Sequence, residues 1–182
     1  MGYKAFSKLS LTPIPPMFSR LSRWVAVSLL VSGTATGFMA AAAPAKAELE
    51  QGTTLVLAAP AQNVDVRGYV KGAVALFKTV GDRDSNQKRC MGYGSLTPDH
   101  TLQVSQKMSQ VMLQVRSKQQ QDTTLVVEGP DNRLYCSDDS SQGGKEAELV
   151  LTNLKAGNYK VWIGAFEPGA GFRYTLNVKS QP

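Results

Sequence analysis

The sequence predicts an all-β protein, an antiparallel β-sandwich preceded by a signal peptide, and three observations predict this fold. From Glu48 onward the chain consists of short β-branched and apolar runs separated by Gly, Pro, Asn and Asp. In several runs apolar and polar residues alternate, as in a strand that is buried on one face only. No window in this region offers an amphipathic helical repeat with capping residues at both ends. Many short strands of this kind are typical of a sandwich or a barrel.

Residues 1–47 have the parts of a secretory signal peptide. Arg20 and Arg23 precede an apolar and small-residue stretch over residues 24–43, and Pro44-Ala45-Lys46-Ala47 supplies an A-x-A cleavage site. Cleavage after Ala47 would leave a periplasmic or extracellular protein, and Met17 is an alternative start to Met1. An uncleaved anchor is the competing interpretation, because residues 24–43 are just long enough to span a bilayer, but their Ser, Thr and Gly content disfavours it.

The charge distribution argues against a nucleic-acid partner. The net charge is +6, but the first 47 residues hold five of the 20 Lys and Arg and no acid, which leaves 15 basic against 14 acidic residues. The exported part is therefore nearly neutral, without the basic patch that nucleic acid or anionic lipid requires. After signal cleavage we expect no membrane contact.

Residues 48–63 are predicted to be an N-terminal linker or edge strand, and residues 64–182 the sandwich domain. The predicted strands, in chain order, are residues 53–58, 64–70, 73–79, 101–105, 110–116, 123–128, 133–136, 147–152, 158–166 and 172–179. Three of them alternate clearly, so we expect one face to point to the core. The core-facing residues are Val111, Leu113, Val115, Tyr159, Val161, Ile163, Tyr174, Leu176 and Val178.

Turn residues separate the strands. Gly129-Pro130-Asp131-Asn132 is the predicted turn before the strand of Cys136, and Pro168-Gly169-Ala170-Gly171 the turn of a hairpin. The polar residues 117–122 are predicted as an exposed hairpin tip. Tyr159 follows Leu154-x-x-Gly157, a pattern typical of a tyrosine corner, in which the hydroxyl bonds to an upstream backbone group.

Cys90 and Cys136 are predicted to form a disulfide. An even number of cysteines in an exported chain is most simply a bridge. Metal binding would require CxxC or Cys/His spacing, and a catalytic thiol a neighbouring histidine, of which the chain has one.

Over most of residues 66–178 the order of motifs resembles small secreted bacterial proteins related to the pre-peptidase C-terminal (PPC) domain. The motifs are Gly72-Ala73-Val74-Ala75-Leu76, Cys90-Met91-Gly92-Tyr93-Gly94, Pro98-Asp99-His100, Gly129-Pro130-Asp131-Asn132, Cys136-Ser137-Asp138-Asp139 and Leu154-Lys155-Ala156-Gly157-Asn158-Tyr159. The resemblance implies a jelly-roll-like sandwich, attached to secreted peptidases or standing alone, with roles in calcium binding, targeting or substrate contact. This chain has no peptidase domain, so a separately encoded peptidase is one conceivable partner.

Two groups of acidic residues are candidate calcium ligands. Asp82 and Asp84 fall in a stretch with oxygen side chains at every second position, as in calcium loops, although Asx-turns in a solvated loop explain the same residues. The loops of a sandwich could also bring together Asp122, Asp131, Asp138 and Asp139. Paired carboxylates can act in glycoside hydrolysis as well, but two adjacent acids in a Ser-rich turn normally face water.

His100 is the only histidine, so a histidine-based catalytic site would have to use it. No G-x-S-x-G or H-E-x-x-H motif occurs. The residues Pro98-Asp99-His100 favour a turn that enters the next strand, with His100 hydrogen-bonded locally.

Trp162 is predicted on the face opposite Val161 and Ile163, together with Lys160 and Phe166. An exposed aromatic residue beside a cation could stack on a sugar or dock a partner protein. Alternatively, the same Trp162 covers the outer side of a sheet.

The sequence therefore predicts a secreted, non-catalytic binding or accessory module that contacts an extracellular protein or polysaccharide, with calcium as the expected cofactor. A small hydrolase that uses acidic loop residues and a structural component of the cell envelope are the alternatives.

Overall fold

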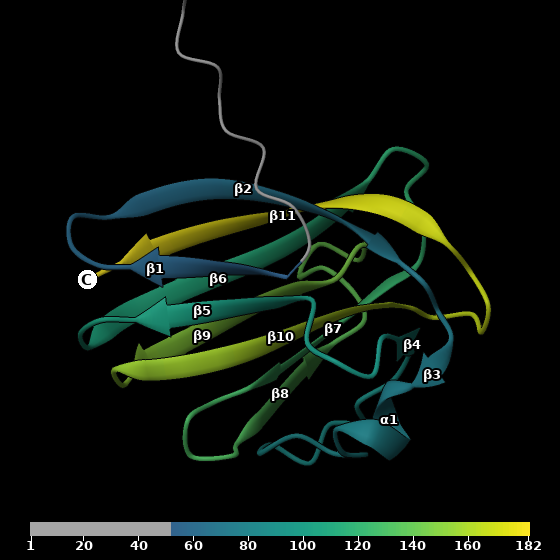
Figure 1. The fold of residues 1–182 in the computed structure, drawn as a ribbon, viewed down its shortest axis with the longest axis horizontal. Coiled ribbons are helices and arrows are strands. Elements are labelled where there is room, and N and C mark those ends of the chain that lie inside the picture. Colours follow the sequence, from purple (N-terminus) through teal and green to yellow (C-terminus); the bar gives the residue numbers. More distant parts are fainter. Residues whose placement is uncertain (1–51) are drawn as a thin grey trace, which may run out of the picture. The chain divides into compact units, whose positions relative to one another are not determined.

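The computed structural model describes residues 52–182, and within them two β-sheets pack face to face (Figure 1). The signal peptide predicted for residues 1–47 and the start of the predicted linker lie outside the described residues. Across residues 52–182, no helix has the length and apolarity needed to cross a membrane. The predicted all-β sandwich is confirmed.

The first sheet has four strands, and each neighbouring pair is antiparallel. In spatial order they are β2 (Gln62–Val70), β11 (Phe172–Gln181), β6 (Met108–Ser117) and β9 (Glu148–Leu154). The pairing of β2 with β11 joins the beginning of the domain to its end over nine residue pairs, from Phe172↔Val70 to Ser180↔Gln62.

The second sheet has seven strands. They are β1 (Thr53–Leu57), β3 (Val74–Ala75), β4 (Tyr93–Gly94), β5 (His100–Val104), β7 (Thr123–Glu128), β8 (Leu134–Ser137) and β10 (Gly157–Ala165). Strand β10 lies at the centre: β5 and β4 pair along one side of it, and β7 pairs along the other and continues to β8. Residues 53–57 are thus an edge strand, since β1 pairs with β5.

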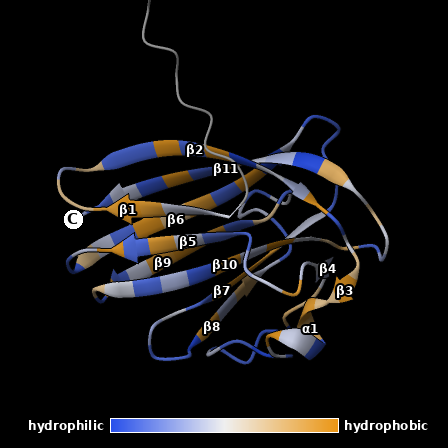
Figure 2. Cartoon of the chain, in the orientation of Figure 1, coloured by the Kyte–Doolittle hydropathy of each residue, from blue (hydrophilic) through white to orange (hydrophobic). Residues whose placement is uncertain are grey.

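The core lies between the two sheets and consists of the apolar faces that alternate along the strands (Figure 2). The nine residues predicted to face inward are all buried there: Val111, Leu113, Val115, Tyr159, Val161, Ile163, Tyr174, Leu176 and Val178. At roughly 1.5–3 kcal/mol for each fully buried aliphatic side chain, this layer supplies the main stabilisation of the fold.

Two predicted turn features are confirmed. Strands β7 and β8 form a hairpin through residues 129–132, where the Gly129 amide donates to Arg133 O at 2.8 Å and Asn132 adopts a positive φ of 59°. The Tyr159 hydroxyl donates to Lys155 O at 3.1 Å, as expected for a tyrosine corner.

The two other predicted hairpins are wrong, because the strands on either side belong to different sheets. Residues 117–122 connect β6 of the four-stranded sheet to β7 of the seven-stranded sheet, and residues 168–171 lie between β10 and β11 in the same way. The sandwich is also not purely antiparallel, since β1 and β5 run parallel. Alternation indicates which face of a strand is buried, but it carries no information about the neighbouring strand.

The strand predicted over residues 73–79 is also corrected. Only β3 is extended, and a single helical turn, α1 (Leu76–Thr79), follows it. Strand β4 pairs with only two residues of β3. After the Leu76 amide, which donates to Gly92 O at 3.0 Å, the backbone bonds within the turn, from Val80 N to Leu76 O at 2.8 Å. Strand β4 itself is too short for any alternation, and the sequence did not indicate it.

Candidate functional site

The outer face of the seven-stranded sheet carries a second, smaller apolar cluster. It consists of Leu76, Cys90, Val126, Cys136 and Trp162. The predicted disulfide is confirmed: Cys90 and Cys136 are bonded, with 5.2 Å between their Cα atoms. The bridge attaches the loop before β4 to strand β8, so that this loop covers part of the sheet that would otherwise face water.

Residues 90–94 fold closely onto β7 and β10 because glycine removes the side chain at the points of contact. Gly92 has a φ of 106°, and a Cβ at this position would collide with Thr124 Oγ1. A Cβ at Gly164 would lie 2.9 Å from Tyr93 O. The close approach lets Leu76 N donate to Gly92 O at 3.0 Å, which ties the start of α1 to this segment.

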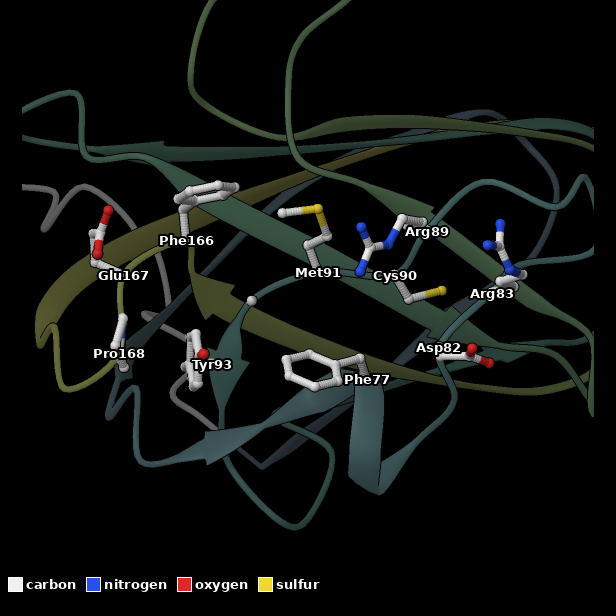
Figure 3. Close-up of a pocket in the computed structure, with 11 residues that line it drawn as sticks. Phe77, Asp82, Arg83, Arg89, Cys90, Met91, Tyr93, Phe166, Glu167 and Pro168 are labelled. Atoms are coloured by element: carbon white, nitrogen blue, oxygen red, sulfur yellow. The ribbon is translucent and has the colours of Figure 1, made fainter.

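A pocket of about 380 Å³ opens beside this segment, and we refer to it as the aromatic pocket (Figure 3). Three aromatic side chains line it, from three separate places in the fold: Phe77 of α1, Tyr93 of β4, and Phe166, which directly follows β10. The rings of Phe77 and Tyr93 meet edge to face with their centroids 6.1 Å apart. The volume lies at the lower end of the range of ligand pockets, about 300–1,000 Å³.

Charged side chains lie around these rings. Figure 3 shows Phe166, Met91 and Arg89 along one side of the aromatic pocket and Tyr93 and Phe77 along the other. Glu167 lies at one end of the row, and Asp82 and Arg83 lie at the opposite end. The pocket therefore combines an apolar surface with both signs of charge, an arrangement that suits recognition of an amphipathic ligand.

The three residues predicted to bind a ligand occupy three different environments. Trp162 is only 5% exposed and belongs to the outer cluster. The prediction of an exposed ring is therefore wrong, and the alternative prediction, that Trp162 covers the outer side of the sheet, is correct. Lys160 is exposed but forms an ion pair with Glu128, with 3.1 Å between Nζ and Oε1. Phe166, 37% exposed, is the member of the group that lines the aromatic pocket.

The first two candidate calcium ligands have separate surroundings. Asp84 is buried, and its Oδ1 accepts the backbone amides of Asn86 and Lys88 at 2.8 Å each. These bonds form the Asx-type turn that the sequence offered as the alternative to a calcium loop. Asp82 is exposed at one end of the aromatic pocket.

The other four candidate ligands divide into one isolated residue and one group. Asp131 lies in the β7–β8 turn, where Arg133 Nε is 3.4 Å from its Oδ2. Burial raises the pKa of Asp122, Lys145 opposes this increase, and the carboxylates of Asp139, Asp138 and Glu167 add to it. Asp138 in turn pairs with Lys88 at 3.1 Å. Within residues 52–182, no three Asp, Glu, His or Cys side chains are arranged to hold a metal ion.

His100 lies inside the sandwich and not in a solvated turn, which corrects the predicted local hydrogen bond. The side chain is 1% exposed, and its Nε2 lies 2.8 Å from the hydroxyl of Tyr174, a residue of the opposite sheet. Burial lowers the pKa of His100 to about 4 and raises that of Tyr174, which the nearby carboxylate of Asp99 raises further. A buried imidazole of this kind has no access to an external substrate.

Sequence reasoning missed most of the aromatic pocket. Phe77, Arg89 and Met91 come from α1 and from a loop, where no periodicity marks an inward or outward direction. The available signal was the segment Cys90-Met91-Gly92-Tyr93-Gly94, in which a cystine and two glycines flank large side chains.

No protein-family model and no curated protein sequence matches the chain. Among solved structures, the chain is similar to the pre-peptidase C-terminal domain of a collagenase from Bacillus anthracis, with 15% identity, a TM-score of 0.43, and coverage of 74% of this chain and 98% of that domain. It is also similar to a periplasmic inhibitor of g-type lysozyme from Aeromonas hydrophila, with 11% identity, a TM-score of 0.41, and coverage of 74% and 100%. At these values a similarity assigns neither a family nor a function.

Proposed function

We propose that the chain is an exported, non-catalytic binding module that contacts another protein outside the cytosol through the aromatic pocket. The observation that carries the proposal is the convergence of Phe77, Tyr93 and Phe166 with two arginines around one opening. Aromatic residues, Met and Arg are enriched in the central regions of protein interfaces, where a few of them contribute most of the binding energy.

Export is supported by the disulfide and by the signal-peptide pattern of residues 1–47. Bridges of this kind form and persist in oxidising compartments and are rare in the cytosol of most organisms. The buried position of both sulfur atoms in the outer cluster agrees with a permanent structural bridge.

The absence of catalysis is proposed from the environments of the titratable groups. A general base needs access to its substrate and a pKa near the working pH. His100, the only histidine in the chain, is buried and has its pKa lowered to about 4. Asp138, one of the two adjacent acids proposed for catalysis, is paired with Lys88 at 3.1 Å.

A protein is a better candidate partner than a polysaccharide. An exposed Trp162 beside Lys160 was expected to stack on a sugar or to dock a protein, but the ring is buried and the ammonium group is paired with Glu128, so this face supports neither contact. In the aromatic pocket the half-buried rings of Phe77 and Tyr93 stand at 83° to each other, which suits inserted side chains better than a flat sugar face.

Site-specific photocrosslinking tests the proposal. A benzoylphenylalanine placed at Phe166 is expected to yield a discrete crosslinked protein when the full chain is exposed to envelope and secreted proteins of the source cells. Val150, 44% exposed on the edge strand β9, provides a matched control position for Phe166, which is 37% exposed. The variant Phe77→Ala should reduce the Phe166 crosslink about tenfold or more, the usual range for loss of an interface anchor.

The proposal fails if Phe166 and Val150 give the same products, or if the product at Phe166 is insensitive to Phe77→Ala. A purely structural component of the envelope would give no pocket-dependent product.

Calcium dependence is the second part of the proposal, and it concerns Asp122, Asp138 and Asp139. The three carboxylates are near enough that two of them raise the pKa of the third, a repulsion that a divalent cation would relieve. Because no three ligands are already arranged for an ion, the loops would have to close around it. We therefore expect weak binding, with Kd on the order of 10⁻⁴–10⁻³ M as in extracellular modules.

Thermal melting with increasing CaCl₂ tests this part. We expect a saturable increase in Tm for the native chain and for Asp131→Asn, and none for Asp139→Asn, because Asp139 belongs to the group around Asp122 and Asp131 does not. An unchanged Tm and no heat in calorimetric titration, at concentrations well above the expected Kd, would remove calcium from the proposal without affecting the aromatic pocket.

A further inference from the structure

Arg89 is the charged side chain nearest the middle of the aromatic pocket, whereas Asp82, Arg83 and Glu167 lie toward its ends (Figure 3). Its guanidinium forms no hydrogen bond or ion pair with another residue of the described range 52–182, and it is directed toward the space between Met91 and Phe77 (Figure 3). By contrast, Arg83 Nη1 donates to Gln87 O at 2.9 Å, and Lys88 pairs with Asp138. The guanidinium is a planar group with five N–H donors, and here it has no partner among the described residues and lies beside an apolar surface. It is therefore suited to donate hydrogen bonds to a carboxylate.

The charge of the surrounding segment favours the same partner. Residues 76–93 contain four basic side chains, Lys78, Arg83, Lys88 and Arg89, against two acidic ones, Asp82 and Asp84. Asp84 is buried and bonded to two backbone amides, so its charge is compensated locally. Among the charged residues that line the pocket itself, Arg89 lies beside the apolar side chains, and the carboxylates of Glu167 and Asp82 lie at the two ends, so an anionic group that enters between the rings meets Arg89 first.

The apolar part of the pocket specifies a second element of the ligand. Phe77, Tyr93 and Phe166 provide ring surfaces, and Met91 adds a flexible thioether that adapts to different apolar shapes. A volume of about 380 Å³ has room for one or two side chains and is too small for a folded element.

We propose that the aromatic pocket binds a segment of a partner protein in which a carboxylate side chain stands next to an aromatic or large aliphatic side chain. This inference rests on the proposed function and specifies the chemistry of its partner. The carboxylate pairs with the free guanidinium of Arg89, and the apolar side chain inserts between Met91 and the rings of Phe77 and Tyr93. With these two contacts, binding requires both the carboxylate and the adjacent apolar side chain of the partner segment.

The methyl group of Met91 offers a direct reporter of binding. The chain has six methionines, of which Met91 lines the pocket and Met108 is fully buried in the core. With ¹³C-methyl-labelled methionine in the full chain, the signal of Met91, assigned with Met91→Leu, should shift on binding, while that of Met108 should not. The probes are octapeptides, blocked at both ends, that differ only in their central pair: Phe-Glu, Phe-Gln, Phe-Lys or Ala-Glu.

We expect the Phe-Glu peptide to shift Met91 saturably and to bind about tenfold or more tightly than each of the other three peptides, because a charge-assisted bond and a buried ring each contribute at least this factor. Arg89→Gln should abolish the preference for Phe-Glu over Phe-Gln. Arg116→Gln is the matched control: it removes an exposed arginine of β6, in the other sheet, and should leave the preference unchanged.

Equal affinity for Phe-Glu and Phe-Gln, tighter binding of Phe-Lys, or a preference that survives Arg89→Gln would overturn the inference. So would a Met91 signal that none of the peptides shifts. If the photocrosslink at Phe166 persists in any of these cases, the pocket binds a protein of other chemistry and the proposed function stands. If the crosslink is absent as well, both fail.

Discussion

Replacement of Cys90 and Cys136 together by alanine is expected to lower the free energy of unfolding by about 4 kcal/mol. The bridge closes a loop of 46 residues, and the chain-entropy model assigns about this value to a loop of that length. Both cysteines are also buried against Leu76, Val126 and Trp162. The bridge therefore holds the loop before β4 over this apolar surface. A loss of this size is a large fraction of the stability of an ordinary domain.

Urea denaturation of the native chain and of the double variant, each with and without dithiothreitol, measures the effect. The reductant should bring the native chain to the stability of the variant and leave the variant itself unchanged. If the oxidised native chain and the double variant unfold at the same urea concentration, the disulfide does not stabilise the fold.

Acidification from pH 7.5 to pH 4 is expected to remove about 3 kcal/mol of stability through His100 alone. Burial lowers the pKa of His100 from 6.5 to about 4, so between these pH values the unfolded chain binds a proton that the folded chain does not. The contribution of neutral His100 to the free energy of unfolding is therefore complete above about pH 6.5, and it decreases as the pH falls toward 4. At about 1.4 kcal/mol for each pKa unit, the shift corresponds to the stated value.

The geometry explains why protonation is unfavourable. Nδ1 of His100 is buried without a hydrogen-bond partner in the described part of the chain, and Nε2 faces the hydroxyl of Tyr174 at 2.8 Å. An imidazolium would place two donors and a charge between the sheets, and the Tyr174 hydroxyl is the one hydrogen-bond partner that the ring has within residues 52–182.

The single histidine makes the measurement direct. One imidazole resonance should titrate in the folded protein, with a midpoint well below 6.5. The variant His100→Gln should lose about 3 kcal/mol less than the native chain over the same pH interval in chemical denaturation, since the remaining pH dependence comes from carboxylates. A resonance that titrates near pH 6.5 without unfolding would contradict the assigned environment.

Much of the fold followed from local patterns. The alternation in residues 110–116, 158–166 and 172–179 identified the buried faces correctly, because side chains of a strand point to opposite sides whatever strand lies beside it. The pairing of Cys90 with Cys136 followed from there being two cysteines, and the tyrosine corner of Tyr159 from a contact only four residues away. These features depend on composition or on near neighbours in the chain.

The candidate site was much less predictable. Phe166 was identified as a ligand-binding residue, but Phe77, Arg89 and Met91 were not, since loops and single helical turns have no periodicity from which a direction can be read. The acidic residues were grouped by type, and the structure separates Asp84 and Asp131 from the group around Asp122. Which loops meet depends on strand order.

The sequence by itself determined that the domain is a β-sandwich with known inner faces and one disulfide, because alternation and cysteine number are properties of short segments. Only the tertiary structure decided that β2 pairs with β11, that Trp162 is covered, that His100 lies against Tyr174, and that a pocket opens beside the bridge. Each of these depends on the free energy of contacts between residues far apart in the chain. Such contacts form only when the whole set of strands is assembled.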